Sequence, residues 1–205
     1  MLSFTLYMLP ATLYLIDRSQ ELAREWQEQF VNCPAIEVLS GDYFQKSADA
    51  IVSPANSFGI MDGGLDLAIR NELGFAIEQK VQEVIVQKYH GELPVGCAEI
   101  VDTNDMRWKY LIAAPTMRIP QSIRFTINTY LAFRAILVAI ENFNQAHGFA
   151  AINSCICPGL GTGVGGVSAA TCARQMRAAY QTMKSVARIP SYEAIHEFHS
   201  SLQRL

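Results

Sequence analysis

A glycine-rich segment, residues 158–168, limits what this chain can fold into more than any other stretch. Its sequence, Pro-Gly-Leu-Gly-Thr-Gly-Val-Gly-Gly-Val-Ser, holds five glycines. An apolar run typical of a β-strand (149–156) precedes it, and a pattern typical of a helix (168–184) follows it. Glycine adopts positive φ and leaves backbone N–H groups open to an anion, and a helix start adds unpaired donors. The segment therefore predicts a strand, a phosphate-binding loop and a helix in succession.

Short strand patterns alternate with helical patterns along the rest of the chain. Ser19 is a predicted N-cap, and Leu22, Trp26 and Phe30 form an apolar stripe on the helix that follows it. The predicted strands are 12–16, 36–39, 50–52, 97–101, 110–113 and 149–156, and the further predicted helices are 65–73, 75–88, 122–146, 168–184 and 192–202. This order predicts an α/β fold with three α/β/α layers, in which a mixed central sheet has helices on both faces. Ligands of such folds bind at the carboxyl ends of the strands.

Length and composition predict one globular domain over residues 1–205. Half of the residues are hydrophobic and 17% are charged, which is enough for one sizeable core. The apolar start (1–16) has no basic region or cleavage site and contains Pro10, so it does not match a signal peptide. No apolar run approaches the roughly 18 residues of a membrane span. Five cysteines without framework spacing indicate reduced thiols. These features predict a cytoplasmic protein without a membrane partner.

The charge distribution favours a small anion over a nucleic acid. A net charge of −3 argues against a nucleic-acid partner, which would require a basic face. No Asp or Glu occurs between Asn142 and Tyr192, whereas arginines and lysines occur in and just after the 168–184 helix. An anion at the glycine-rich segment therefore meets no acid nearby in the sequence. His196 and His199 share a helix face, but no further ligand completes a metal site, and we expect neither a metal nor a cofactor.

Three other interpretations of the glycines are a dinucleotide site, a Walker loop and a turn required only for packing. Gly161-x-Gly163-x-x-Gly166 matches the dinucleotide fingerprint, but a nicotinamide site needs an acid about 20 residues later, and 181–190 contains none. No Gly-Lys-Ser/Thr follows, which excludes a Walker loop. The third interpretation, a turn that serves only to pack a helix on a sheet, stays open.

A second loop, residues 53–66, also follows a short strand and enters a helix, and it contains Gly59, Gly63 and Gly64. Two such loops on one sheet edge fit a diphosphate. Asn56 offers donors and acceptors for ribose hydroxyls, and Asp66 at a helix start can accept from a hydroxyl or orient water. The competing interpretation is that Asn56 adopts a left-handed turn and that Asp66 only complements the helix dipole.

Several segments in order resemble the macro domain, an ADP-ribose-binding α/β/α module. They are Gly41-Asp42, Asp49-Ala-Ile-Val-Ser-Pro-Ala-Asn56, Gly63-Gly-Leu-Asp-Leu-Ala-Ile69 and Gly161-Thr-Gly-Val164. The resemblance spans about 36–184, with the first strand and helix and the last helix as extensions. The glycine pattern is also similar to that of macro-domain-like proteins among bacterial and phage tail-associated sequences.

The resemblance implies particular roles for the site residues. Asp42 would accept from the adenine amine, and Asn56 would contact the distal ribose. Asp66 matches the acid that positions water in the family's hydrolytic branch, where a solvated, ionised aspartate suffices. The implied ligand is ADP-ribose or an ADP-ribosylated protein or small molecule, and the implied catalytic pair is Asp66 and Asn56. The implied ligand-binding residues are Asp42, Tyr43, Ala55, Asn56, Phe58, Gly63, Gly64, Leu65, Gly161, Thr162, Gly163, Val164, Gly165 and Gly166.

Three departures from the family pattern bear on activity. Gly165 stands where many active relatives carry an aromatic residue, so Phe58 is the candidate for packing on the distal ribose. Ser53 replaces the first Asn of the usual Asn-Ala-Ala-Asn, and Asp62 adds a negative charge beside the expected diphosphate. The sequence therefore leaves two predictions of function. The first is hydrolysis of an ADP-ribosyl ester or of O-acetyl-ADP-ribose, and the alternative is a non-catalytic ADP-ribose-binding module or a tail-associated structural module.

Overall fold

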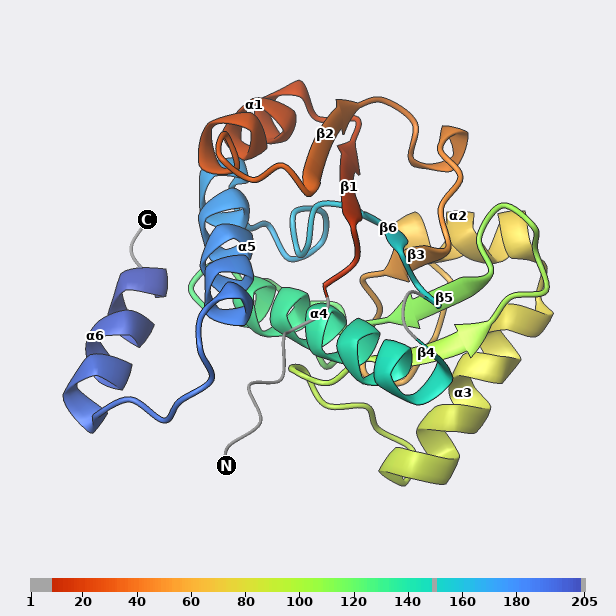
Figure 1. The fold of residues 1–205 in the computed structure, drawn as a ribbon. Helices are drawn as coiled ribbons and strands as arrows, with labels where there is room; N and C mark the ends of the chain where they lie inside the picture. Colours follow the sequence, from red (N-terminus) through yellow and green to blue (C-terminus); the bar gives the residue numbers. More distant parts are fainter. Residues whose placement is uncertain (1–8, 149–150, 204–205) are drawn as a thin grey trace.

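The computed structural model describes residues 9–148 and 151–203 (Figure 1). Its centre is a six-stranded sheet in the order β2-β1-β6-β3-β5-β4, in which β4 runs antiparallel to β5 and the other pairs are parallel. The strands are β1 (Thr12–Asp17), β2 (Ile36–Ser40), β3 (Ala50–Ser53), β4 (Glu99–Asp102), β5 (Tyr110–Ala113) and β6 (Ser154–Cys157). The helices are α1 (Gln20–Gln29), α2 (Gly64–Leu73), α3 (Ala76–Tyr89), α4 (Asn128–His147), α5 (Ala169–Lys184) and α6 (Tyr192–Gln203), and a 3-10 turn, η1, spans Tyr43–Gln45.

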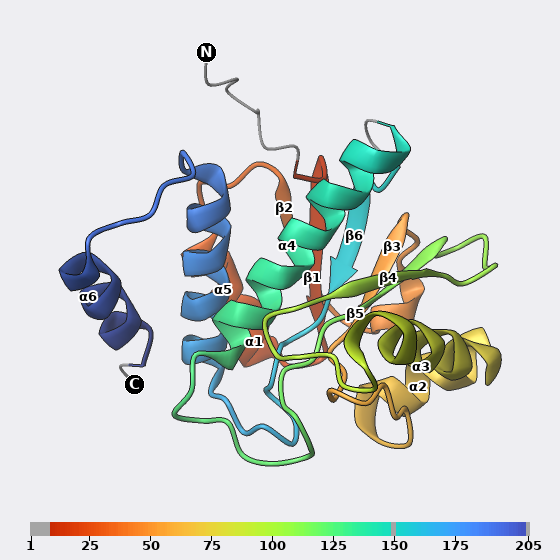
Figure 2. The same cartoon turned by 90° about the horizontal axis from the view of Figure 1, so that it is seen from below.

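Helices cover both faces of the sheet, as Figure 2 shows. Successive strand residues point to opposite faces, so β3 sends Val52 into a core shared with α1, α4 and α5, and Ile51 into a core shared with α2 and α3. The predicted three-layer α/β/α fold with a mixed sheet is therefore confirmed. The first strand lies between β2 and β6 and contributes Leu13 and Leu15 to the core, which makes it an integral part of the sheet.

The first helix forms as its sequence predicts. The Ser19 side chain accepts a hydrogen bond from the Leu22 amide at 3.2 Å and caps α1. Leu22, Trp26 and Phe30 are buried against the sheet and α5. The predicted strands 97–101 and 110–113 are also present, as the antiparallel pair β4 and β5 with Ile100 opposite Ile112.

Two predicted boundaries were wrong. Helix α4 begins at Asn128, not at residue 122, because residues 122–127 pack against the glycine-rich segment, where the Ile123 amide donates to the Gly165 carbonyl at 2.9 Å. Strand β6 begins at Ser154, where the Asp49 carboxylate accepts from the Ser154 amide at 2.8 Å. The first two residues of that predicted strand, 149–150, lie outside the described residues.

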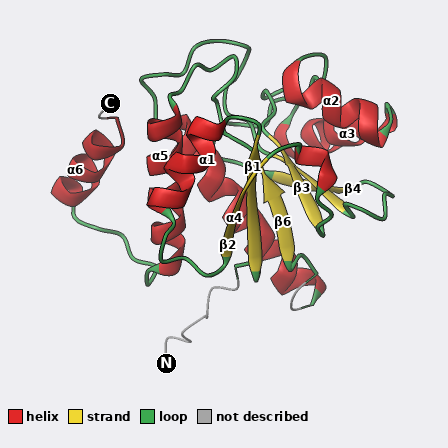
Figure 3. Cartoon of the chain, turned by 90° about the horizontal axis from the view of Figure 1, so that it is seen from above, coloured by secondary structure: helices red, strands yellow, loops and turns green. Residues whose placement is uncertain are grey.

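Helix α6 lies beside α5 at one side of the molecule (Figures 1 and 3). Leu202 is its buried residue, and the Leu202 carbonyl accepts from the Gln175 side chain at 3.0 Å. Phe198 makes an edge-to-face contact with Tyr130 at 5.5 Å between ring centroids. Among the described residues, no helix combines the length and apolar character that crossing a bilayer requires.

Candidate functional site

The predicted site residues gather where the parallel strands end. Figure 3 shows the loops that follow the strands at one end of the sheet, between α5 and α2. Strands β3 and β6 are hydrogen-bonded neighbours, and neighbouring strands lie about 4.8 Å apart. The 53–66 loop and the glycine-rich segment therefore begin side by side, as a shared ligand site requires.

Four of the five glycines in the segment lie where an added Cβ would come closer than 3.0 Å to another atom. A Cβ at Gly159 would lie 2.6 Å from Leu22 Cδ2. A Cβ at Gly161 would lie 2.7 Å from Ile123 Cδ1, and one at Gly165 would lie 2.4 Å from the Gly161 carbonyl oxygen. Gly166 has a φ of +65°, and a Cβ there would lie 2.6 Å from Arg124 Nε. The interpretation that these glycines allow close packing thus holds for four positions. Gly159 lies against Leu22 of helix α1, and the other three lie against the 122–127 loop or the backbone of the segment itself.

The same segment keeps a row of open backbone donors. Within it, the Gly166 amide donates to Gly163 and the Val167 amide donates to Gly161, both at 3.0 Å. The amides of residues 162–165 make no hydrogen bond to any described residue. A Cβ at Gly163 would meet no atom within 4 Å, so this position faces open space. Open amides around open space can bind an anion.

The Asn56 side chain makes hydrogen bonds within the 53–66 loop and fixes its conformation. Its Oδ1 accepts from the amides of Phe58 at 3.0 Å and Ile60 at 3.3 Å, and its Nδ2 donates to the Ile60 carbonyl at 2.7 Å. The left-handed backbone considered for Asn56 belongs instead to Gly59, with a φ of +63°. Contact of Asn56 with a ribose stays a prediction. One Nδ2 hydrogen has no hydrogen-bond acceptor among the described residues and is the group that could make this contact.

The start of helix α2 is a second set of open donors. The Met61 amide donates to Glu78 Oε1 at 2.9 Å, and Glu78 forms an ion pair with Arg70 at 2.9 Å, which fixes the loop against α3. Gly63 occupies the N-cap without a side-chain hydrogen bond. The amides of residues 64–66 have no partner within the described part of the chain. An uncapped helix start of this kind attracts negative charge.

The Asp66 carboxylate lies on the first turn of α2, against the end of β3. The buried Ser53 hydroxyl donates to Asp66 Oδ1 at 2.5 Å. Burial raises the pKa of Asp66 to about 6, the Ser53 hydrogen bond opposes the rise, and the negative charge of Asp62 adds to it. The side chain is therefore half-buried against the strand end rather than fully solvated, and with a pKa of about 6 its carboxyl is still mostly ionised at neutral pH.

The raised pKa of Asp66 predicts how stability depends on pH. The ordinary value is 3.8 and the folded value about 6, so the folded chain binds more protons between these values. Stability from this group is therefore complete below about pH 4 and is lost as the pH rises through about 6. We expect Asp66→Asn to stabilise the protein by about 1–3 kcal/mol at pH 7.5 and to have little effect at pH 4. Chemical denaturation at both values measures this, and equal effects at both would contradict it.

Asp42 and Tyr43 follow β2. Asp42 Oδ1 accepts from the Phe44 amide and Oδ2 accepts from Arg18 Nη2, each at 3.0 Å, and these contacts lower the pKa of the Asp42 carboxyl. The Tyr43 hydroxyl is buried between two strands, 2.5 Å from the Val52 carbonyl oxygen and 3.3 Å from that of Ile156. The Asp42 carboxylate is therefore half-buried just after β2, whereas the Tyr43 ring belongs to the core, and a role for either residue in ligand binding stays a prediction.

The remaining predicted residues divide into core and surface positions. Ala55 is buried, and its carbonyl accepts from the Thr116 amide at 3.1 Å. The Phe58 ring lies 5.1 Å from the Arg118 guanidinium carbon, and Arg118 also pairs with Glu92 at 2.7 Å. Val164 is exposed at the tip of the glycine-rich segment.

Sequence reasoning missed three residues that shape the site. Ile123 fills the space beside Gly161 and Gly165, Arg124 lies against Gly166, and Asp17 accepts from the Gly159 amide at 3.2 Å. Ile123 and Arg124 fall in a stretch with a helical pattern, so local sequence gave no signal of their position. The missing aromatic residue at position 165 was the one available indication that another side chain fills that space.

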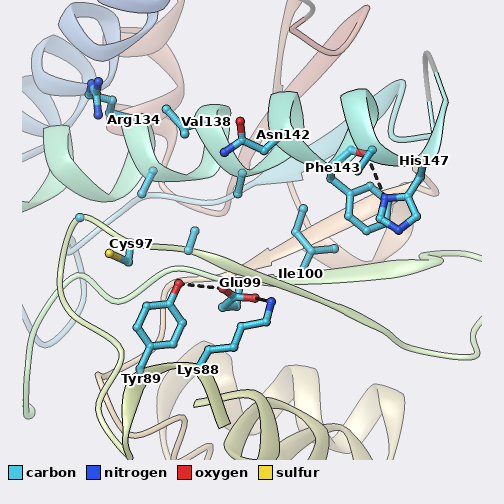
Figure 4. Close-up of a pocket in the computed structure, with 15 residues that line it drawn as sticks. Lys88, Tyr89, Cys97, Glu99, Ile100, Arg134, Val138, Asn142, Phe143 and His147 are labelled. Atoms are coloured by element: carbon cyan, nitrogen blue, oxygen red, sulfur yellow. Dashed lines mark hydrogen bonds and ion pairs between the residues drawn. The ribbon is translucent and has the colours of Figure 1, made fainter. Parts of the chain in front are cut away.

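Two cavities lie away from these loops. The cavity in Figure 4, of about 610 Å³, lies between α4 and β4, where Glu99 accepts from Lys88 and from the Tyr89 hydroxyl, both at 2.7 Å. The other, of about 900 Å³, lies between α4, the end of α5 and α6. Neither is lined by a predicted site residue. No cluster of three or more His, Cys, Asp or Glu suited to a metal occurs in residues 9–148 and 151–203.

The sequence is similar to known proteins. Residues 52–176 match the Macro domain. An uncharacterized protein of Aquifex aeolicus is 35% identical over 141 residues, which cover 69% of this chain and 78% of that protein. A macro domain-containing protein of Caldanaerobacter subterraneus, TTE0995, is 34% identical over 79 residues, which cover 38% of this chain and 44% of that protein.

Solved structures show the same fold. The macrodomain of Mycobacterium tuberculosis DarG aligns with a TM-score of 0.58 and 22% identity, covering 75% of this chain and 96% of that one. An Oceanobacillus iheyensis macrodomain with ADP aligns with a TM-score of 0.56 and 21% identity, covering 78% and 87%. A mutant of that macrodomain with ADPR aligns with a TM-score of 0.57 and 22% identity, covering 72% and 77%. These alignments show the fold, and the match of residues 52–176, more than half of the chain, shows that the chain belongs to the Macro domain family.

Proposed function

We propose that this protein binds ADP-ribose, free or attached to a protein or small molecule, at the carboxyl edge of its sheet. One observation carries the proposal: open backbone amides of residues 162–165 and of residues 64–66 follow two neighbouring strands. Two rows of donors suit the two phosphates of one diphosphate. The macrodomains with ADPR and ADP among the structural relatives support this choice of ligand.

The parts of the ligand are assigned by chemistry. The diphosphate would accept from the two rows of amides. The Asp42 carboxylate, at the end of β2, would accept from the adenine amine while it keeps its bond to Arg18. The distal ribose would then lie toward Asp66 and Asn56, next to β3. Phe58 remains the proposed packing surface for that ribose.

We further propose that Asp66 supports hydrolysis at the distal ribose. A carboxylate held by Ser53 at an open helix start is oriented and can position a water molecule. The second candidate is a module that binds without turnover, in the cell or as part of a tail-associated assembly. This second candidate is favoured by Asn56, because its side chain already makes hydrogen bonds within its own loop and has one Nδ2 hydrogen left for a ligand. A cytoplasmic location belongs to this proposal and is supported by five free cysteines.

Isothermal titration calorimetry tests the proposal. We expect saturable one-to-one binding of ADP-ribose, with AMP and NAD at least about tenfold weaker, since AMP lacks the diphosphate and NAD carries a nicotinamide on its distal ribose. Val186→Ala, which shortens an exposed side chain outside the two loops, serves as a control with wild-type affinity. Equal affinities for AMP and ADP-ribose, or no binding at millimolar ADP-ribose, would refute the proposal.

A further inference from the structure

The loop between β5 and α4 brings an arginine to the glycine-rich segment. The Ile123 amide donates to the Gly165 carbonyl at 2.9 Å, which fixes the backbone beside Arg124. A Cβ at Gly166 would lie 2.6 Å from Arg124 Nε, 3.2 Å from Nη2 and 3.3 Å from Cζ. The guanidinium group therefore lies directly against the backbone of the proposed phosphate loop.

Arg124 differs from other arginines at this end of the sheet in its pairing. Arg18 is 3.0 Å from Asp42, Arg118 is 2.7 Å from Glu92, and Arg70 is 2.9 Å from Glu78. Within residues 9–148 and 151–203, Arg124 has no carboxylate within 4.0 Å. Arg124 is exposed, so a ligand in solution can reach its positive charge.

The charge balance of the site calls for such a cation. Asp17 and Asp66 lie at strand ends beside the two loops, and the exposed Asp62 lies just before α2. These acids repel a diphosphate, and backbone amides supply only partial positive charge in return. An unpaired guanidinium beside Gly166 offsets that repulsion.

We propose that Arg124 binds the diphosphate of the ligand together with the amides of the glycine-rich segment, so that the site selects organic diphosphates by charge as well as by shape. This inference rests on the proposed function. The planar guanidinium donates two parallel hydrogen bonds to phosphate oxygens, which a lysine cannot reproduce. Because its backbone is fixed through Ile123, Arg124 loses less conformational freedom on binding than an arginine on an unanchored loop.

A packing role for Arg124 would leave a different signature. If the guanidinium only supported Gly166, its removal would lower the melting temperature and affect affinity independently of salt. A phosphate-binding role makes affinity depend on the positive charge and on ionic strength, while the folded state is largely unaffected. The two roles therefore separate when stability and salt dependence are measured together.

The experiment titrates ADP-ribose into wild type, Arg124→Gln and Arg124→Lys at about 50 and 300 mM salt. We expect Arg124→Gln to bind about tenfold more weakly at low salt, equivalent to about 1.4 kcal/mol, and to lose most of the salt dependence seen in wild type. Arg124→Lys should lie between the two. Arg188→Gln, which removes the same charge at the α5–α6 connection, is the control and should match wild type.

The outcomes are distinguishable. Absence of ADP-ribose binding by wild type overturns the proposed function itself. Wild-type affinity and salt dependence in Arg124→Gln overturn the role of Arg124 alone and leave the proposed function intact. A loss of affinity that is equal at both salt concentrations and accompanied by a lower melting temperature assigns Arg124 to packing and overturns this inference.

Discussion

Replacing Asp66 with alanine is expected to reduce the release of ADP-ribose from an ADP-ribosylated glutamate side chain by about 100-fold or more. The carboxylate, held by Ser53 at 2.5 Å, is the group positioned to orient a water molecule, and losing such a group costs about 10²–10⁴ in rate. Affinity for ADP-ribose should stay within about threefold, because the amides at the start of α2 remain in place. Turnover assays and calorimetry on the same preparations measure both quantities.

Asp62→Asn is the matched control for this variant. Asp62 is exposed four residues before Asp66, and its charge raises the Asp66 pKa. Removing that charge should lower the Asp66 pKa, keep or increase turnover near pH 6, and strengthen binding of the diphosphate slightly. Wild-type turnover in Asp66→Ala would remove this residue from the mechanism, and no turnover by wild type would favour the binding module.

Replacing Gly165 with valine is expected to damage both stability and binding. The added Cβ would lie 2.4 Å from the Gly161 carbonyl oxygen and 2.7 Å from Ile123 Cγ1, and backbone cannot give way as a flexible side chain does. We expect a loss of about 2 kcal/mol or more in unfolding free energy and loss of detectable ADP-ribose binding. Chemical denaturation and calorimetry check the two effects.

Gly163→Ala tests the same loop from its open side. Gly163 lacks a positive φ, and its Cβ would meet no atom within 4 Å, so stability should change by less than about 0.5 kcal/mol. The methyl group would, however, stand in the space that the diphosphate is proposed to occupy, and affinity should fall. If Gly163→Ala were as destabilising as Gly165→Val, the described packing of the loop would be wrong.

The fold could be predicted from the sequence because its signals are local. Ser19 caps α1 through a hydrogen bond three residues along the chain, and the Leu22 and Trp26 stripe buries one helix face. Consecutive apolar residues such as Ile51 and Val52 are typical of a strand covered on both faces, and the structure places them in separate cores.

The site was less predictable because its properties arise from contacts between distant segments. The helical pattern of 122–127 gave no sign that Ile123 would pack on Gly161, since that contact joins residues far apart in the chain. The Asp66 pKa depends on burial against β3, which composition cannot reveal. The number of glycines was also a weaker indicator of phosphate than it seemed, because the close neighbours of Gly159, Gly161, Gly165 and Gly166 leave little room for a Cβ.

The most direct test follows individual backbone amides by ¹⁵N-edited NMR while ADP-ribose is added. Signals of residues 162–165 and of residues 64–66 should shift together and saturate with one dissociation constant, while the solvent-exposed amides near Val186 stay unchanged. If the amide signals of either row kept their chemical shifts at saturating ADP-ribose, the two loops would not share one diphosphate and the account would be contradicted.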